Sequence, residues 1–262
     1  MPSPDLSDLL KEIVISVQAY FKAHQFIRQH GLWKWIIVPG IVYALLFGVS
    51  MYFFSQSATA AIEYLTIQTG LQQWISRLQD SWIGFLFTMG GIMLWLILML
   101  LYFSLFKYIW LILGSPVFSY LSDKTASLIE GRQHAFSWKQ YLQDVVRGIR
   151  MAARNTLWQS VYLLSIIVLS LFPLVGWASP VLAVLIECYY YGFSMLDYSC
   201  EREQMSTAES IDFIGRNKGL AIGNGMVFYM MHAVLFIGWI FAPAYAVIAA
   251  TISIHQIRTK QH

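Results

Sequence analysis

Apolar residues along the chain form long runs that are separated by short polar segments. Two of these runs, residues 35–54 and 82–106, are long and uncharged. A helix needs about 20 mostly apolar residues to cross the hydrocarbon core of a bilayer. The pattern therefore predicts transmembrane helices over residues 35–54 and 82–114, the second continuing past its apolar run as far as Gly114. We expect Pro39-Gly40 to kink the first helix, or to separate an interfacial turn from the span proper.

Two pairs of shorter apolar arms follow, each around a similar uncharged turn. The first hairpin, residues 157–196, contains "LFPLVGWASPVLAV", and the second, residues 220–254, contains "LFIGWIFAPAYAV". Some of these arms are too short for a full crossing. They fit short spanning hairpins whose tryptophans touch the outer interface. They also fit re-entrant hairpins that turn inside the membrane, where irregular backbone must be buried in protein or line a wet cavity. Arm length and the repeated turn favour re-entry.

The polar segments have the pattern of amphipathic helices. Residues 1–34 form one such pattern at the N-terminus. Ser115-Pro116 is suited to start a helix that Gly131 ends. Ser137 with Gln140, and Ser206 with Glu209, have the spacing of capping boxes, so a helix is predicted after each.

The helix predicted after Ser137 is amphipathic and basic. Its apolar stripe consists of Trp138, Tyr141, Leu142, Val145, Ile149 and Ala152, with Arg147, Arg150 and Arg154 outside the stripe. Such a helix commonly lies on anionic lipid headgroups. Alternatively, Arg147 and Arg150 draw anions into a cytoplasmic vestibule.

Composition settles the class of protein. Hydrophobic residues make up 58% of the 262 residues and charged residues only 12%, about half the charge of an ordinary soluble domain. We therefore predict an all-α integral membrane protein. A net charge of +3 without a basic run excludes a nucleic-acid partner. No set of residues for a metal, a cofactor or an enzymatic reaction is present, and Cys188 and Cys200 form no metal-binding pair.

The distribution of charge predicts the orientation. Arg77 is the only basic residue between positions 55 and 81, whereas Lys and Arg are frequent elsewhere in the polar segments. Basic residues are retained in the cytoplasm during insertion. Residues 55–81 are therefore expected outside, with both termini in the cytoplasm.

Three uncharged or acidic positions are candidates for an anion pathway within the membrane. Helices that start at Ser179-Pro180 and at Ala242-Pro243 would point their partly positive N-termini at an anion. Glu187 lies in an apolar arm, and an acid inside a membrane is a functional candidate. It could instead be satisfied by a hydroxyl of Tyr189–Tyr191 or be protonated.

Several longer motifs resemble one known family over nearly the whole chain. These are "HGLWKW", "LGSPVFSYLSDK", "YYYGFSMLDYSCERE", "GRNKGLAIGNGMVFYMM" and "APAYAVIAAT". In their order and spacing the chain resembles the CysZ sulfate permeases and the wider etoposide-induced-protein family. The resemblance implies two full transmembrane helices plus two hairpins that partly penetrate the bilayer. It also implies a homo-oligomer in the bacterial inner membrane that passes sulfate into the cell for cysteine synthesis.

The resemblance points to one turn as an oxyanion site. In the permeases a glycine-containing turn is followed by arginine; here Gly31-Leu32 is followed by Trp33 and Lys34, with Arg28 upstream. Lysine binds sulfate as a point charge but lacks the planar fork of arginine. The same residues would also serve as an interfacial anchor of Trp and Lys. Loss of the arginine would fit a second possibility, a membrane scaffold of the same family that transports nothing.

Overall fold

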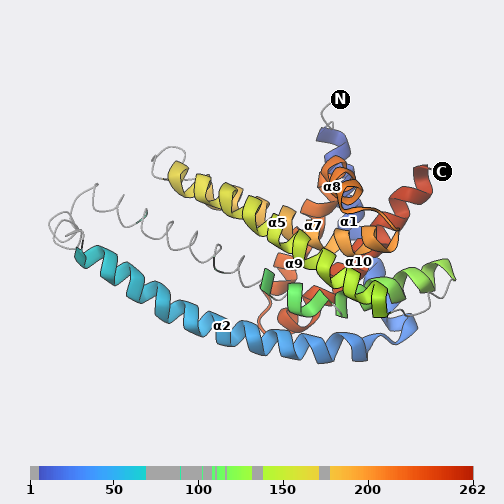
Figure 1. Cartoon of the computed structure of the whole chain (residues 1–262), viewed down its shortest axis with the longest axis horizontal. Helices are drawn as coiled ribbons and strands as arrows, with labels where there is room; N and C mark the ends of the chain where they lie inside the picture. The colour runs from blue at the N-terminus through green and yellow to red at the C-terminus, as the bar shows by residue number, and fades with distance from the viewer. Residues whose placement is uncertain are drawn as a thin grey trace.

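The protein is helical throughout the part of the chain that this computed structural model describes: residues 6–68, 89, 102, 108–109, 111–115, 117–131, 138–170 and 178–261. The labelled helices are α1 (Leu6–His30), α2 (Trp33–Gln68), α5 (Trp138–Ser170), α7 (Ser179–Arg202), α8 (Thr207–Arg216), α9 (Lys218–His232) and α10 (Ile237–Gln261). Figure 1 shows α2 and α5 as two long rods that extend to one side, with α7 running back alongside α5, while α1, α9 and α10 gather at the other.

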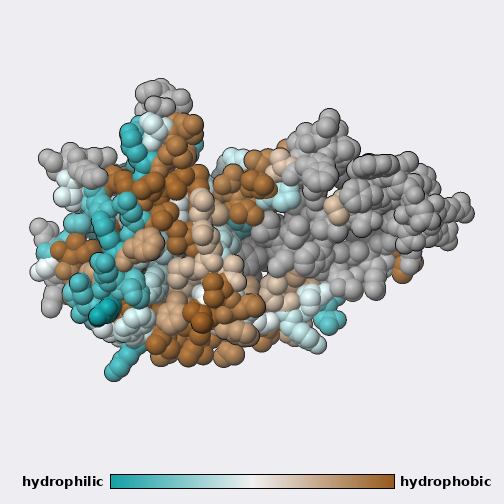
Figure 2. Space-filling model, turned by 180° about the vertical axis from the view of Figure 1, so that it is seen from behind, coloured by the Kyte–Doolittle hydropathy of each residue, from teal (hydrophilic) through white to brown (hydrophobic). Residues whose placement is uncertain are grey.

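Among the described residues, three helices are long and apolar enough to cross a membrane: Trp33–Ser57, Ser179–Arg202 and Ile237–Thr259. The first contains the span predicted over residues 35–54, and Pro39 lies inside an unbroken helix. The predicted span over residues 82–114 falls largely outside the described residues. Figure 2 shows hydrophilic residues gathered toward the end that carries the C-terminus, and hydrophobic residues along the lower surface.

Helix α9 lies at the centre because its small residues allow close approach on two sides. Gly219 and Gly223 face the backbone of α1, and a Cβ at either position would overlap it. Gly225 approaches the carbonyl of Cys188 on α7 in the same way. Small residues at such spacing let membrane helices pack backbone to backbone.

The N-terminal helix is part of this core rather than a peripheral element. On α1, Ser16 donates a hydrogen bond to the Leu220 carbonyl (3.1 Å), and Tyr20 donates one to the Asn224 carbonyl (2.8 Å). The Gly219 N–H donates to Glu12 (2.8 Å). Burial raises the pKa of Glu12, and this N–H partly opposes the shift.

The first hairpin differs from the sequence-based expectation in one respect. The basic segment and the first apolar arm are one continuous helix, α5, of 33 residues. Its buried face includes Met151, Asn155 and Leu163, whereas Ile149 of the predicted apolar stripe is 43% exposed. An exposed apolar side chain here fits a helix whose apolar stripe lies on lipid, one of the two alternatives for this segment.

The second hairpin turns earlier than its sequence suggests. The chain reverses at residues 233–236, where Phe236 has a positive φ of 61°, and α10 begins at Ile237. The Trp239 indole donates to the carbonyl of His232 across this turn (3.1 Å). The second arm of this hairpin, which the sequence predicts over residues 244–254, therefore belongs to a helix of 25 residues. The prediction that this arm is too short to cross a bilayer was wrong.

Candidate functional site

The turn between α1 and α2 is held by the hydrogen bond of a Schellman motif. Gly31 adopts the left-handed conformation (φ 64°), and the Leu32 N–H donates to the Ile27 carbonyl (3.2 Å). Glycine favours this conformation because it has no Cβ. The Leu32 side chain is buried, so the turn is fixed from both its backbone and its side chain.

This turn presents positive charge next to the start of a candidate span. Arg28, His30 and Lys34 are exposed. Within the described part of the chain, Arg28 and Lys34 form no ion pair. The Trp35 N–H donates to the Leu32 carbonyl (3.1 Å); the other N–H groups of the first turn of a helix generally lack intrahelical partners, and a helix N-terminus attracts anions. The residues predicted to bind an oxyanion are thus gathered in one fixed and accessible turn.

Trp33 has a different surrounding from its basic neighbours. Its ring makes edge contacts with His24 (6.3 Å between centroids) and with Phe241 on α10 (6.2 Å). His24 Nδ1 in turn lies 2.7 Å from the Tyr245 hydroxyl, also on α10. Trp33 therefore ties the turn to α10 and offers the anion no charged group of its own.

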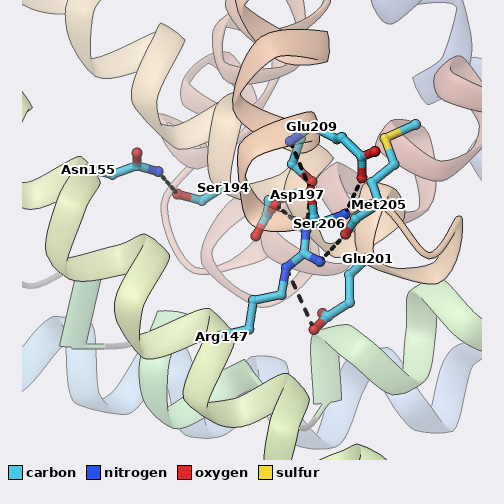
Figure 3. A network of polar contacts seen from close by, with 9 residues as sticks. Arg147, Asn155, Ser194, Asp197, Glu201, Met205, Ser206 and Glu209 are labelled. Atoms are coloured by element: carbon cyan, nitrogen blue, oxygen red, sulfur yellow. Dashed lines mark hydrogen bonds and ion pairs between the residues drawn. The ribbon is translucent and has the colours of Figure 1, made fainter.

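Arg147 lies in a buried polar network and not in an open vestibule (Figure 3). Its guanidinium bonds the Asp197 carboxylate (3.0 Å), the Ser210 hydroxyl (2.6 Å) and the Met205 carbonyl, with Glu201 at 3.9 Å. This pairing joins α5 to α7 and to the loop before α8. The side chain of Arg147 is only 16% exposed. Arg150, on the same helix, is exposed.

A second polar cluster lies deeper along the same two helices. Glu187 on α7 is completely buried and accepts hydrogen bonds from Gln159 on α5 and from the Tyr229 hydroxyl on α9 (2.7 Å). Tyr108 donates to the Oε1 atom of Gln159 (2.6 Å). The hydroxyl bonded to Glu187 is thus that of Tyr229, on another helix, rather than one supplied by Tyr189–Tyr191.

The two predicted helix starts have different outcomes. Helix α7 begins at Ser179 with Pro180 in its first turn, as expected. The Ser179 hydroxyl is buried and has no hydrogen-bond partner in the described part of the chain. Pro243, by contrast, lies inside α10, six residues after its start at Ile237. The prediction of a helix N-terminus at Ala242-Pro243 was wrong, because the tight turn at residues 233–236 allows the helix to begin before the proline.

Two buried polar residues of α5 were not predicted from the sequence to be candidate functional residues. Asn155 and Gln159 are completely buried, and Asn155 donates to the Ser194 hydroxyl (3.2 Å). A signal was available, because Met151, Asn155, Gln159 and Leu163 recur every fourth residue. Among the described residues, no group of three or more His, Cys, Asp and Glu side chains is placed to hold a metal ion.

Comparison with known proteins agrees with these features. Residues 19–243 match the family described as sulfate transporter CysZ/etoposide-induced protein 2.4. The chain belongs to this family. A sulfate transporter CysZ of Pseudomonas paraeruginosa (strain PA7) is 24% identical over 238 residues, which cover 87% of this chain and 89% of the relative. Proteins of the same name from Pseudomonas aeruginosa strains LESB58 and PAO1 are each 24% identical over 234 residues.

Family membership and fold together establish the general class. The family is named for a transporter, and the described helices include three candidate membrane spans. The protein is therefore a membrane protein of a sulfate-transporter family.

Proposed function

We propose that this protein carries sulfate across the membrane into the cytoplasm and binds it at the turn between α1 and α2. The observation that carries the proposal is the fixed turn at Gly31, which sets Arg28 and Lys34 free in solvent beside the start of α2. A tetrahedral dianion suits such a site, because it accepts hydrogen bonds from several N–H groups at once.

A second anion position is proposed at the start of α7. Ser179 offers a buried hydroxyl there, together with the partly positive N-terminus of a helix of 24 residues. Residues 171–177, which complete this turn, lie outside the described residues.

The proposal is tested by uptake of radiolabelled sulfate into proteoliposomes, with chloride and phosphate as competitors. Lys34→Ala should weaken sulfate binding by roughly 1.5–3 kcal/mol, the range for a charge-assisted hydrogen bond. Lys34→Arg should bind as well or better. Lys22→Ala, which removes an exposed basic residue elsewhere on α1, is the matched control. Unchanged affinity in folded Lys34→Ala protein contradicts the site.

A scaffold that transports nothing is the second candidate. It is favoured by Trp33, which anchors the turn on α10 where a permease of the family would be expected to carry arginine. The two candidates differ in one measurement, since a scaffold gives no sulfate uptake above that of empty liposomes. A cell with this protein as its sole sulfate importer would then also fail to make cysteine from sulfate.

Both termini are proposed to lie in the cytoplasm, as the distribution of basic residues predicts. Both hairpins are proposed to be re-entrant on the ground of the family resemblance and the repeated turn, because α10 is long enough to span a membrane and arm length therefore does not argue for re-entry. A cysteine placed at Gln72 should react with an impermeant maleimide in intact cells, and one at Gln143 should not. Brominated lipids should quench Trp239 more strongly when the bromine lies deep in the acyl chain. Strongest quenching near the headgroups would place the second turn at the interface.

A further inference from the structure

The facing sides of α5 and α7 differ in chemistry from their outer sides. The face that α7 turns inward includes Ser179, Ala183, Glu187, Ser194 and Asp197, all buried. The outer face of the same helix exposes Val181, Leu182, Val184 and Leu185. Polar side chains thus face the protein interior and apolar ones face outward, as in proteins that conduct polar solutes through a membrane.

Polar pairs follow one another along this seam between α5 and α7. Arg147 pairs with Asp197, Asn155 with Ser194, and Gln159 with Glu187. Gln159 follows Arg147 by twelve positions, which correspond to about 18 Å of helix. The polar pairs therefore extend from the polar end of α5 well into its apolar arm.

Beyond Glu187 the facing side chains of α5 and α7 are apolar. Leu163, Ile166 and Ala183 form a separate apolar cluster, with Leu163 completely buried. Past this cluster lies Ser179, one helical turn from Ala183, with its unpaired buried hydroxyl. The order along the seam is therefore polar, apolar and polar again.

Helix adhesion alone does not explain this order. Hydroxyl and amide pairs are common between membrane helices, but adhesion does not require a carboxylate, and acids inside membranes are expensive and functional. Glu187 draws its hydrogen bonds from two other helices, α5 and α9. The Gln159 amide and the Tyr229 hydroxyl both donate to the carboxyl group of Glu187, so they form a donor set that would also suit a sulfate oxygen.

We infer that the seam between α5 and α7 is the translocation pathway and that Leu163, Ile166 and Ala183 form its hydrophobic closure. This inference rests on the proposed function. In the closed arrangement the hydrogen-bond donors of the seam are paired: Arg147 with Asp197, Asn155 with Ser194, and Gln159 with Glu187. Passage requires the two helices to separate at the closure, where a narrow apolar constriction excludes water and ions until it widens.

Two neighbouring leucines provide a matched test of the closure. Leu163 is buried in the seam, whereas Leu164 is 55% exposed on the outer face of the same helix. Leu163→Ser should raise the initial rate of radiolabelled sulfate uptake into proteoliposomes by about tenfold, the effect of removing the apolar surface of one leucine. Leu164→Ser should leave the rate within about twofold. Ile166→Ala carries the same expectation as Leu163→Ser if that variant fails to fold.

The polar part of the seam is tested separately from the binding turn. Asn155→Leu should slow uptake several-fold while the affinity for sulfate, measured by equilibrium binding, stays unchanged because the Gly31 turn is untouched. If Asn155 has only a structural role, Asn155→Leu should lower the amount of folded protein. It should not slow sulfate uptake while leaving the affinity for sulfate unchanged. If folded Leu163→Ser, Ile166→Ala and Asn155→Leu proteins all take up sulfate at the wild-type rate, the seam is not the pathway. The proposed function would still stand. Absence of uptake by the wild-type protein would contradict both.

Discussion

The two hairpins have similar sequences at their turns but are built differently. In the first, Ser179-Pro180 starts α7, and the seam behind it is lined by polar pairs. In the second, the corresponding Pro243 lies inside α10, which continues through residues 246–250, all completely buried and apolar. Exposed apolar side chains gather at its tip instead: Val234, Leu235, Phe236 and Ile237.

This difference shows that a repeated motif does not determine a repeated role. The first hairpin has one polar face along α7, whereas α10 of the second packs against α1, α2, α7 and α9 within the core. The second hairpin thus supports the first and ties it to the turn at Gly31 through Trp33 and Phe241.

The largest effect is expected from breaking the ion pair of the first hairpin. Arg147→Ala leaves the Asp197 carboxylate buried without its partner, which should lower the free energy of unfolding by about 3–5 kcal/mol. Arg150→Ala, an exposed position on the same helix, should change it by no more than about 0.5 kcal/mol. Thermal unfolding in detergent measures both. Equal stability of the two variants would show that the buried network does not hold α5 to α7.

A second substitution tests how closely the two hairpins pack on each other. Gly225→Ala places a Cβ against the Cys188 carbonyl, so α9 and α7 must move apart at an expected cost of about 1–3 kcal/mol. Gly215→Ala on α8 meets nothing within 4 Å and should be neutral or stabilising by about 0.5–1 kcal/mol. The sign of the change in unfolding free energy is therefore expected to differ between the two glycines.

The two prolines sharpen the comparison of the turns. Pro243 removes a hydrogen bond from the interior of α10, so Pro243→Ala should stabilise the protein by about 1 kcal/mol or more. Pro180 occupies the first turn of α7, where its missing N–H costs nothing, and Pro180→Ala should destabilise by up to about 1 kcal/mol. Stability changes of the same sign would contradict the different placement of the two prolines.

The smallest effect concerns the connector between the hairpins. Ser206 accepts a hydrogen bond from the Glu209 N–H (3.3 Å), and the Glu209 carboxylate accepts one from the Ser206 N–H (2.7 Å). Ser206→Ala should destabilise by about 1 kcal/mol, and Ser206→Asp should restore most of the loss.

The same capping box predicts a dependence on pH. The Ser206 N–H lowers the pKa of Glu209 in the folded protein. The stabilisation that the Glu209 carboxylate contributes is therefore present at pH values above the ordinary pKa of a glutamate, about 4.3. It is lost as the pH falls through the lowered pKa of the folded protein. Glu209→Gln should remove this part of the dependence of unfolding on pH. A profile identical to that of the wild-type protein would show that the box does not contribute to stability.

The sequence by itself determined the class of protein, the first span, the start of α7 and the capping box at Ser206. These features depend on composition, on apolar runs and on local backbone chemistry, which are read from neighbouring residues. It also placed the candidate binding residues together, because Arg28 to Lys34 form one short turn.

Only the tertiary structure decided which side of each helix faces inward, where α10 begins and what Glu187 and Arg147 contact. In a membrane protein the side that meets lipid is as apolar as the side that meets the core. Hydrophobic periodicity therefore does not separate the two: Ile149 of the apolar stripe is 43% exposed, whereas the polar residues Asn155 and Gln159 are buried. The partners of Glu187 come from helices that are far apart in the chain, and close contacts at glycines such as Gly225 bring those helices together.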